Sequence, residues 1–190
     1  MHGHIPGSGQ DREYIEDVLA LNVTQGVTFI RGMAGNPYQL ELREEAQRRE
    51  IISPRIIAAG PSFSGGSVST PEEARARVLE QVEAGYDLLK FAPGLSVEVF
   101  DAATETAIAH GMEFSGHISK DVGLIRSLNA GKATIDHLDR YMEFLAGDAA
   151  DREDPPTIWF GYDLTPHVEE ARICDTPRTS PQSRCRPFAI

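Results

Sequence analysis

Residues 88–117 read LLKFAPGLSVEVFDAATETAIAHGMEFSGH, which is two short apolar runs separated by a helix-like segment. The apolar runs, Leu88 to Ala92 and Met112 to His117, are continuous rather than alternating, as expected for strands buried on both faces. Between them, Ser96 to His110 predicts a helix that Gly111 ends. This order indicates two parallel strands joined by a helical crossover.

The same alternation extends from this segment toward both ends of the chain. Further helices are predicted at Asp11–Asn22, Gln39–Glu50, Ser69–Glu83 and Lys120–Asn129, and further strands at Val27–Ile30, Pro54–Gly60 and Ala133–His137. Repeated strand–helix units of this kind favour an α/β fold with a parallel sheet. A complete (β/α)8 barrel needs about 250 residues, and this chain has 190. We therefore expect an incomplete (β/α)8 TIM-type barrel that covers roughly strands one to six.

The repeat weakens after His137, and the composition changes abruptly at Cys174. From there to the end, prolines, arginines and small polar residues replace the periodic apolar pattern. We predict a partial barrel domain over residues 1–173 and a disordered C-terminal tail, unrelated to the barrel, over residues 174–190.

The sequence is acidic, with 29 Asp and Glu against 18 Lys and Arg and a formal net charge of −11. Such a surface repels phosphate backbones and anionic lipids, so neither nucleic acid nor a membrane is an expected partner. No apolar segment approaches the roughly 20 residues needed to span a bilayer, and no secretory leader is evident. The default expectation is a cytoplasmic location.

Five side chains that can bind a metal lie at the ends of the strand-like runs or inside them: His2, His4, Lys90, His117 and His137. His2 and His4 point to the same side of an extended backbone, because side chains two residues apart share a face. His117 and His137 each end a predicted strand. In an α/β barrel the carboxyl ends of the strands converge on one mouth, where active sites lie. The sequence therefore predicts a metal site at that mouth.

Each of these residues also has a simpler interpretation. His2 and His4 could be surface residues, and a histidine after a strand is often only hydrogen-bonded within a loop. Lys90 could pack its stem in the sheet and extend its amine to the barrel rim. Alternatively, Lys90 is carbamylated, or its amine has a pKa lowered by desolvation. The residues alone leave both interpretations of Lys90 open.

A series of motifs in a fixed order resembles the metal-dependent amidohydrolases, most of all the imidazolonepropionase-like subgroup. The resemblance covers roughly Met1 to Arg172 and rests on MHGHIP at 1–6, GVTFIR at 26–31, IIAAGP at 56–61, LLKF at 88–91, SGH at 115–117 and IDH at 135–137. An ordered set of this kind is more specific than any single motif.

The resemblance implies a role for each candidate ligand. His2 and His4 match the first-strand metal ligands, and Lys90 matches the fourth-strand lysine that is carbamylated and bridges two metals in many members. His117 and His137 match the ligands of the fifth and sixth strands. The implied cofactor is one or two zinc ions. The implied reaction is the hydrolysis of an amide-like carbon–nitrogen bond in a small molecule, a cyclic amide or a dipeptide, through a metal-activated water.

The chain departs from the family pattern in ways that bear on activity. The pattern stops near Arg172, so the catalytic aspartate of the eighth strand has no counterpart, and the first strand and the flanking β-domain are largely missing. We therefore expect a truncated member with no assigned catalytic residue. The alternative function is a catalytically inactive barrel fragment that binds metal weakly at most. A metal-free, phosphate-binding barrel is less favoured, because no glycine-rich phosphate loop follows a late strand.

Overall fold

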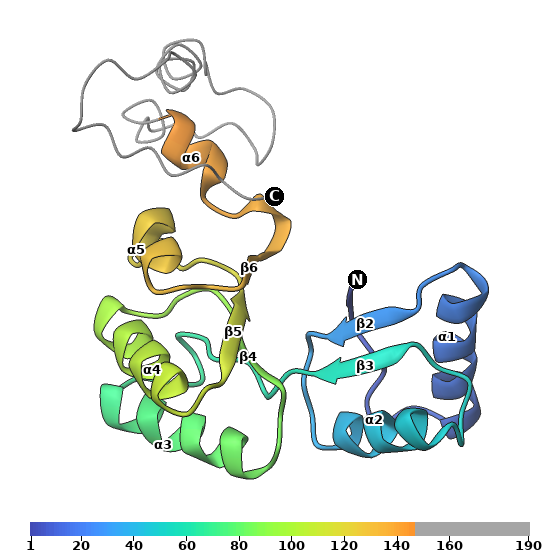
Figure 1. Cartoon of the computed structure of the whole chain (residues 1–190). Helices are drawn as coiled ribbons and strands as arrows, with labels where there is room; N and C mark the ends of the chain where they lie inside the picture. Colours follow the sequence, from blue (N-terminus) through green and yellow to red (C-terminus); the bar gives the residue numbers. More distant parts are fainter. Residues whose placement is uncertain (147–190) are drawn as a thin grey trace, which may run out of the picture. The chain divides into compact units, whose positions relative to one another are not determined.

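The computed structural model describes residues 1–146, so the expected tail over 174–190 lies outside the described residues (Figure 1). The strands are β1 (His2–Gly3), β2 (Phe29–Gly32), β3 (Arg55–Ala58), β4 (Leu88–Phe91), β5 (Glu113–Gly116) and β6 (Thr134–Ile135). The helices are α1 (Arg12–Thr24), α2 (Tyr38–Arg48), α3 (Pro71–Glu83), α4 (Val97–Ala109), α5 (Gly123–Asn129), the 3₁₀ turn η1 (Asp136–Leu138) and α6 (Tyr141–Ala146). Met1–Asp139 form one compact unit, and α6 belongs to a second unit that begins at Arg140.

The strands of the first unit follow one another in sequence order. β1, β2 and β3 form one parallel sheet, and β4, β5 and β6 form another. Two isolated parallel bridges, Ala59 to Leu88 and Phe63 to Phe91, connect the chain after β3 to β4. Neighbours in sequence are thus neighbours in space, as in a series of βα units. This confirms the predicted α/β class with parallel strands.

Side-chain caps explain where several helices begin. Thr70 accepts a hydrogen bond from the backbone N–H of Glu73, whose carboxylate in turn accepts from the N–H of Thr70, so α3 starts with a complete capping box. Pro71 occupies the first turn, where its missing N–H costs nothing. Asp11 caps α1 by accepting from the N–H of Glu13, and Ser96 caps α4 by accepting from the N–H of Val99. These starts agree with the sequence-based prediction.

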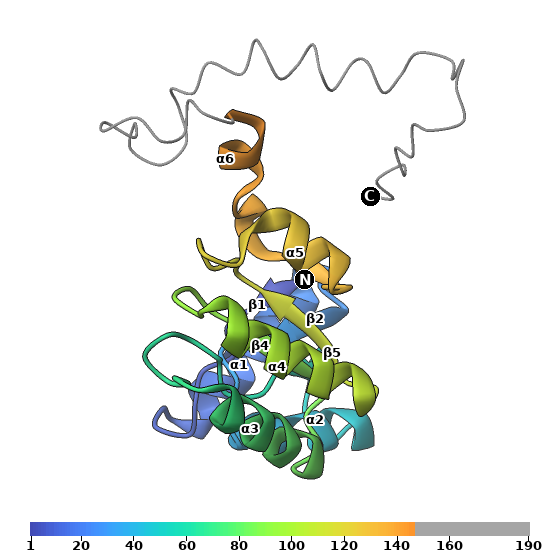
Figure 2. The ribbon, with the colours of Figure 1, turned by 90° about the vertical axis from the view of Figure 1, so that its left-hand side faces the viewer.

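The helices pack on one face of each sheet, and the apolar side chains of the strands point toward them. Ile30 of β2 and Ile56 of β3 pack with α1 and α2 in one buried cluster. Leu89, Phe91 and Phe114 pack with α3 and α4 in a larger cluster. Figures 1 and 2 show α3 and α4 side by side along the β4–β5 strands. Burial of these apolar faces is the main driving force for this arrangement.

The opposite face of the strands carries the polar side chains. Successive residues of a strand point to opposite faces, so Lys90 and its register partner Ser115 point away from the helices. Toward the amino-terminal ends of the strands this face borders a cavity of about 380 Å³. Arg31 and Thr134 line that cavity and are joined by a 2.5 Å hydrogen bond. This hydrogen bond links β2 of the first sheet to β6 of the second.

The last strand is shorter than the sequence predicts. The apolar run predicted a strand through His137, whereas β6 ends at Ile135 and η1 follows directly. His137 and Leu138 adopt left-handed backbone angles, with φ of 56° and 58°. Non-glycine residues rarely adopt this conformation, and a strand cannot continue through it.

Among residues 1–146, no helix has both the length and the apolar character needed to cross a bilayer.

Candidate metal centre

Four of the five predicted ligands are histidines whose rings lie in one continuous series. The ring centroids of His4 and His2 are 5.2 Å apart, those of His2 and His137 are 5.2 Å apart, and those of His137 and His117 are 5.3 Å apart. The rings come from β1 and the residue after it, from the residue after β5, and from η1 after β6. Three distant parts of the chain therefore bring their imidazoles to one place.

A close backbone approach holds the first two histidines in position. β1 pairs with β2, and a Cβ on Gly3 would lie 2.5 Å from Cδ1 of Ile30. Only glycine at this position lets the short strand lie against Ile30 without displacing it. The amide of Met33 also donates to the carbonyl of Gly3 at 2.9 Å. These contacts attach the start of the chain to the sheet.

The ring nitrogens of His2 and His4 are close enough to share a ligand. Their Nε2 atoms are 3.0 Å apart, and two nitrogens bound tetrahedrally to one zinc ion are roughly 3.3 Å apart. The other nitrogen of His2, Nδ1, lies 3.2 Å from Oδ1 of Asp136. Burial lowers the pKa of His2, although the charge of Asp136 opposes this effect. A lowered pKa favours the neutral ring that metal binding requires.

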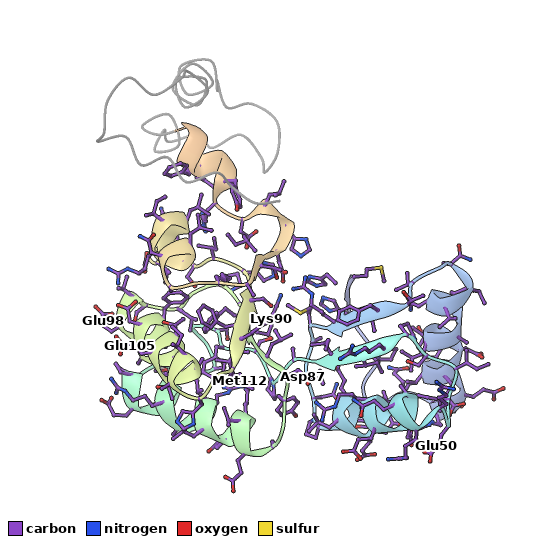
Figure 3. The ribbon with its side chains drawn as sticks, viewed as in Figure 1. Glu50, Asp87, Lys90, Glu98, Glu105 and Met112 are labelled. Carbon is purple, nitrogen blue, oxygen red and sulfur yellow. The ribbon has the colours of Figure 1, made fainter. Side chains whose placement is uncertain are left out.

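Lys90 lies in the middle of β4 (Figure 3). Its amine forms a buried ion pair with Asp136. The amine therefore does not extend into solvent at a rim. Burial alone would raise the pKa of Asp136, but the hydrogen bond and charge of Lys90, together with His2, outweigh it and lower that pKa. Asp136 is thus an anionic acceptor that connects Lys90 to His2.

His117 is held at its ring and at its backbone. Its Nδ1 lies 2.7 Å from Oδ2 of Asp139, and the same oxygen accepts from the backbone N–H of Ile118 at 3.3 Å. The ammonium of Lys132 donates to the carbonyl of His117 at 2.7 Å and lies 4.8 Å from the centre of the Phe91 ring. Burial lowers the pKa of Lys132 to about 7.

The structure adds residues that the sequence prediction missed. Within residues 1–146, His2, Asp136 and His137 each offer a ligand atom, and these atoms lie within 4.8 Å of one another. Asp136 was not predicted, although it directly precedes His137, and Asp139 and Lys132 were not predicted either. A carboxylate within two residues of the candidate ligand His137 was the available signal for Asp136 and Asp139. No comparable signal marked Lys132.

Comparison with known proteins identifies the class of the fold. No family model matches the sequence, and the search of curated proteins finds no match either. Among solved structures, the chain is similar to bottromycin amidohydrolase, with 25% identity and a TM-score of 0.60 over 66% of this chain and 30% of that one. It is also similar to a proposed prolidase from Bifidobacterium longum, with 29% identity and a TM-score of 0.51 over 63% of this chain and 34% of that one.

Both structural neighbours are amidohydrolase-like proteins, in line with the broad part of the sequence resemblance. The chain spans about a third of the length of each neighbour.

Proposed function

We propose that this chain forms six consecutive βα units of an amidohydrolase-type barrel and uses a divalent metal to hydrolyse amide-like carbon–nitrogen bonds. The observation that carries this proposal is the series of four imidazoles beside the buried pair of Lys90 and Asp136. Small molecules such as cyclic amides or dipeptides are the proposed substrates. The order of the motifs favours the imidazolonepropionase-like subgroup within that class.

The donor set fits zinc, because neutral imidazole is a preferred ligand of this ion. His2 and His4 would bind through their facing Nε2 atoms, with His117 and His137 completing the set. Lys90 would contribute only in its carbamylated form, since an ammonium group has no lone pair. A bound zinc ion would lower the pKa of a water molecule and polarise the scissile carbonyl.

Asp136 orients two other side chains of the site, Lys90 and His2. Asp136 accepts hydrogen bonds from Lys90 and from Nδ1 of His2, which leaves Nε2 of His2 without a proton. His137 is exposed, whereas Asp136 is buried. The site therefore has an open side at His137, from which a substrate could approach.

The described residues favour a second candidate function. They bring candidate ligands together, but no side chain among residues 1–146 has an assigned general acid or base role. General acid–base help contributes about 10²–10⁴-fold to a rate. The second candidate is therefore a metal-binding barrel fragment without turnover.

Zinc binding to the full chain tests the proposal. The metal-free protein would be titrated with zinc by calorimetry, together with His117→Ala, His137→Ala and the control His110→Ala. His110 is exposed at the end of α4, so its removal should leave the affinity unchanged. We expect each ligand variant to bind zinc about tenfold more weakly or worse.

Turnover then separates the two candidate functions. A panel of cyclic amides and dipeptides would be assayed with and without a chelator. Chelator-sensitive hydrolysis supports the enzyme, whereas zinc binding without hydrolysis supports the fragment. A wild-type chain that binds no zinc overturns both.

A further inference from the structure

We propose that Asp139 is a positioning residue that fixes the tautomer of His117 with its proton on Nδ1, so that Nε2 is the nitrogen left for a ligand. The role of Nε2 as a metal ligand rests on the proposed function. The tautomer itself does not, because it follows from contacts within the protein.

The contact between the two side chains determines where the proton lies. Nδ1 of His117 and Oδ2 of Asp139 are 2.7 Å apart, which is a hydrogen-bond distance. An ionised carboxylate can only accept, so the hydrogen must belong to Nδ1. A neutral imidazole with a proton on Nδ1 has its free lone pair on Nε2. Asp139 thus selects the nitrogen that remains available.

A second contact directs the same carboxylate oxygen. Oδ2 of Asp139 also accepts from the backbone N–H of Ile118, the residue after His117, at 3.3 Å. The ammonium of Lys132 donates a hydrogen bond to the carbonyl of His117 at 2.7 Å. These two contacts anchor the peptide group after His117, and the backbone N–H of His117 donates to the carbonyl of Phe91 at 2.9 Å. The ring and the backbone on both sides of His117 are therefore anchored, which reduces the freedom of the imidazole to rotate.

The turn that carries Asp139 presents two carboxylates to two different imidazoles. Asp136, at the start of η1, lies 3.2 Å from Nδ1 of His2, and Asp139, just after η1, lies 2.7 Å from Nδ1 of His117. His137 lies between these carboxylates in the sequence and contacts both imidazoles. The left-handed angles of His137 and Leu138 cost about 1–3 kcal/mol each. They turn the chain between the two carboxylates.

Nitrogen-15 NMR of the metal-free, full-length protein tests the tautomer directly. Long-range ¹⁵N–¹H correlations would show for the wild type a protonated Nδ1 and an unprotonated Nε2 at His117. Asp139→Ala should shift the population toward the Nε2-protonated form, whereas Asp139→Asn, which keeps an acceptor oxygen, should retain most of the original tautomer. Glu105→Ala is the matched control, because Glu105 lies on the outer side of α4 and its loss changes the charge equally (Figure 3).

Zinc affinity provides the second measurement. Loss of a carboxylate that orients a metal-ligating histidine typically weakens metal binding by 10- to 100-fold. We expect a loss of about this size in Asp139→Ala, a smaller loss in Asp139→Asn, and none in Glu105→Ala.

The outcomes separate this inference from the proposed function. A wild-type His117 protonated on Nε2, or a tautomer unchanged in Asp139→Ala, overturns the role of Asp139 even when zinc binds. A protonated Nδ1 in a protein that binds no zinc supports the positioning contact and instead overturns the proposed function. The wild-type measurement needs no substitution, so a variant that fails to fold does not weaken the test.

Discussion

Lys90 of β4 and Asp136 of η1 form an ion pair that is almost completely removed from water, with 5% and 2% of their side chains exposed. The two residues are 46 positions apart in the sequence. Asp136 also contacts His2, so the pair joins β1, β4 and the turn after β6 at one point. A buried ion pair adds little to the stability of the folded protein compared with well-packed apolar side chains at the same two positions. Removal of only one partner, however, leaves the other charge buried and unpaired.

Asp136→Ala should therefore destabilise the protein strongly. We expect a loss of about 3–5 kcal/mol in the free energy of unfolding, measured by urea denaturation. The double variant Lys90→Met with Asp136→Leu should recover most of that loss, because no charge remains buried. Equal stability of the single and double variants would contradict the coupling.

Gly116, at the end of β5, should tolerate no side chain. Its φ is 113°, and a Cβ would lie 2.2 Å from the carbonyl oxygen of Phe91, which accepts the hydrogen bond from His117. Gly116→Ala should cost about 3 kcal/mol or more, since backbone strain of about 1–3 kcal/mol adds to the overlap.

Gly111 offers the matched control for this prediction. Its φ is also positive, at 67°, but a Cβ there would meet no atom within 4 Å. Gly111→Ala should therefore cost only the strain of the left-handed conformation, about 1–2 kcal/mol. Thermal unfolding of the two variants would compare them, and a Gly116→Ala protein as stable as Gly111→Ala would contradict the close approach.

Lys132 should make the stability depend on pH. Its pKa falls from the ordinary 10.5 to about 7 in the folded state because it is buried. Between these two values the unfolded chain binds more protons than the folded chain, so the free energy of unfolding rises with pH, by up to about 1.4 kcal/mol per unit. Below pH 7 the full cost of the buried charge is present.

Lys132→Met keeps the packed stem and removes the titration. The metal-free variant should show a flatter rise in stability between pH 7 and 10 than the wild type, as measured by urea denaturation at each pH. Lys120→Met is the control, since Lys120 is exposed and should keep the wild-type slope. Identical slopes for all three proteins would rule out a buried, titrating Lys132.

The capping box of α3 should contribute about 1 kcal/mol. Thr70→Ala removes the side-chain acceptor for the N–H of Glu73 and should lower the free energy of unfolding by that amount. Thr70→Ser keeps the hydroxyl and should remain close to the wild type. A loss of the same size in both variants would point to the methyl group rather than to the cap.

The start of α3 shows what can be predicted from sequence alone. The signal, Thr70 followed by Pro71 and then Glu73, lies within four consecutive residues, and its contacts are made between those same residues. Local contacts of this kind do not depend on the rest of the fold. The same holds for the alternation of apolar strands and helices, and therefore for the α/β class.

The region after β6 shows where such prediction fails. The apolar run Ala133 to His137 indicates a strand, but the chain leaves the strand conformation after Ile135. The contacts of Asp136 and Asp139 with distant residues favour the turn. Those contacts cannot be read from a local pattern, because their partners lie 46 and 22 residues away.

The sequence by itself determined the order of the βα units, the helix starts and the identity of the imidazoles at the strand ends, because these depend on residues adjacent in the chain or on a regular period. Only the tertiary structure decided that Lys90 pairs with Asp136, that Asp139 contacts His117, and that Lys132 is buried and bonds to the carbonyl of His117. The physical reason is that hydrogen bonding and desolvation depend on which side chains the packed sheets bring together.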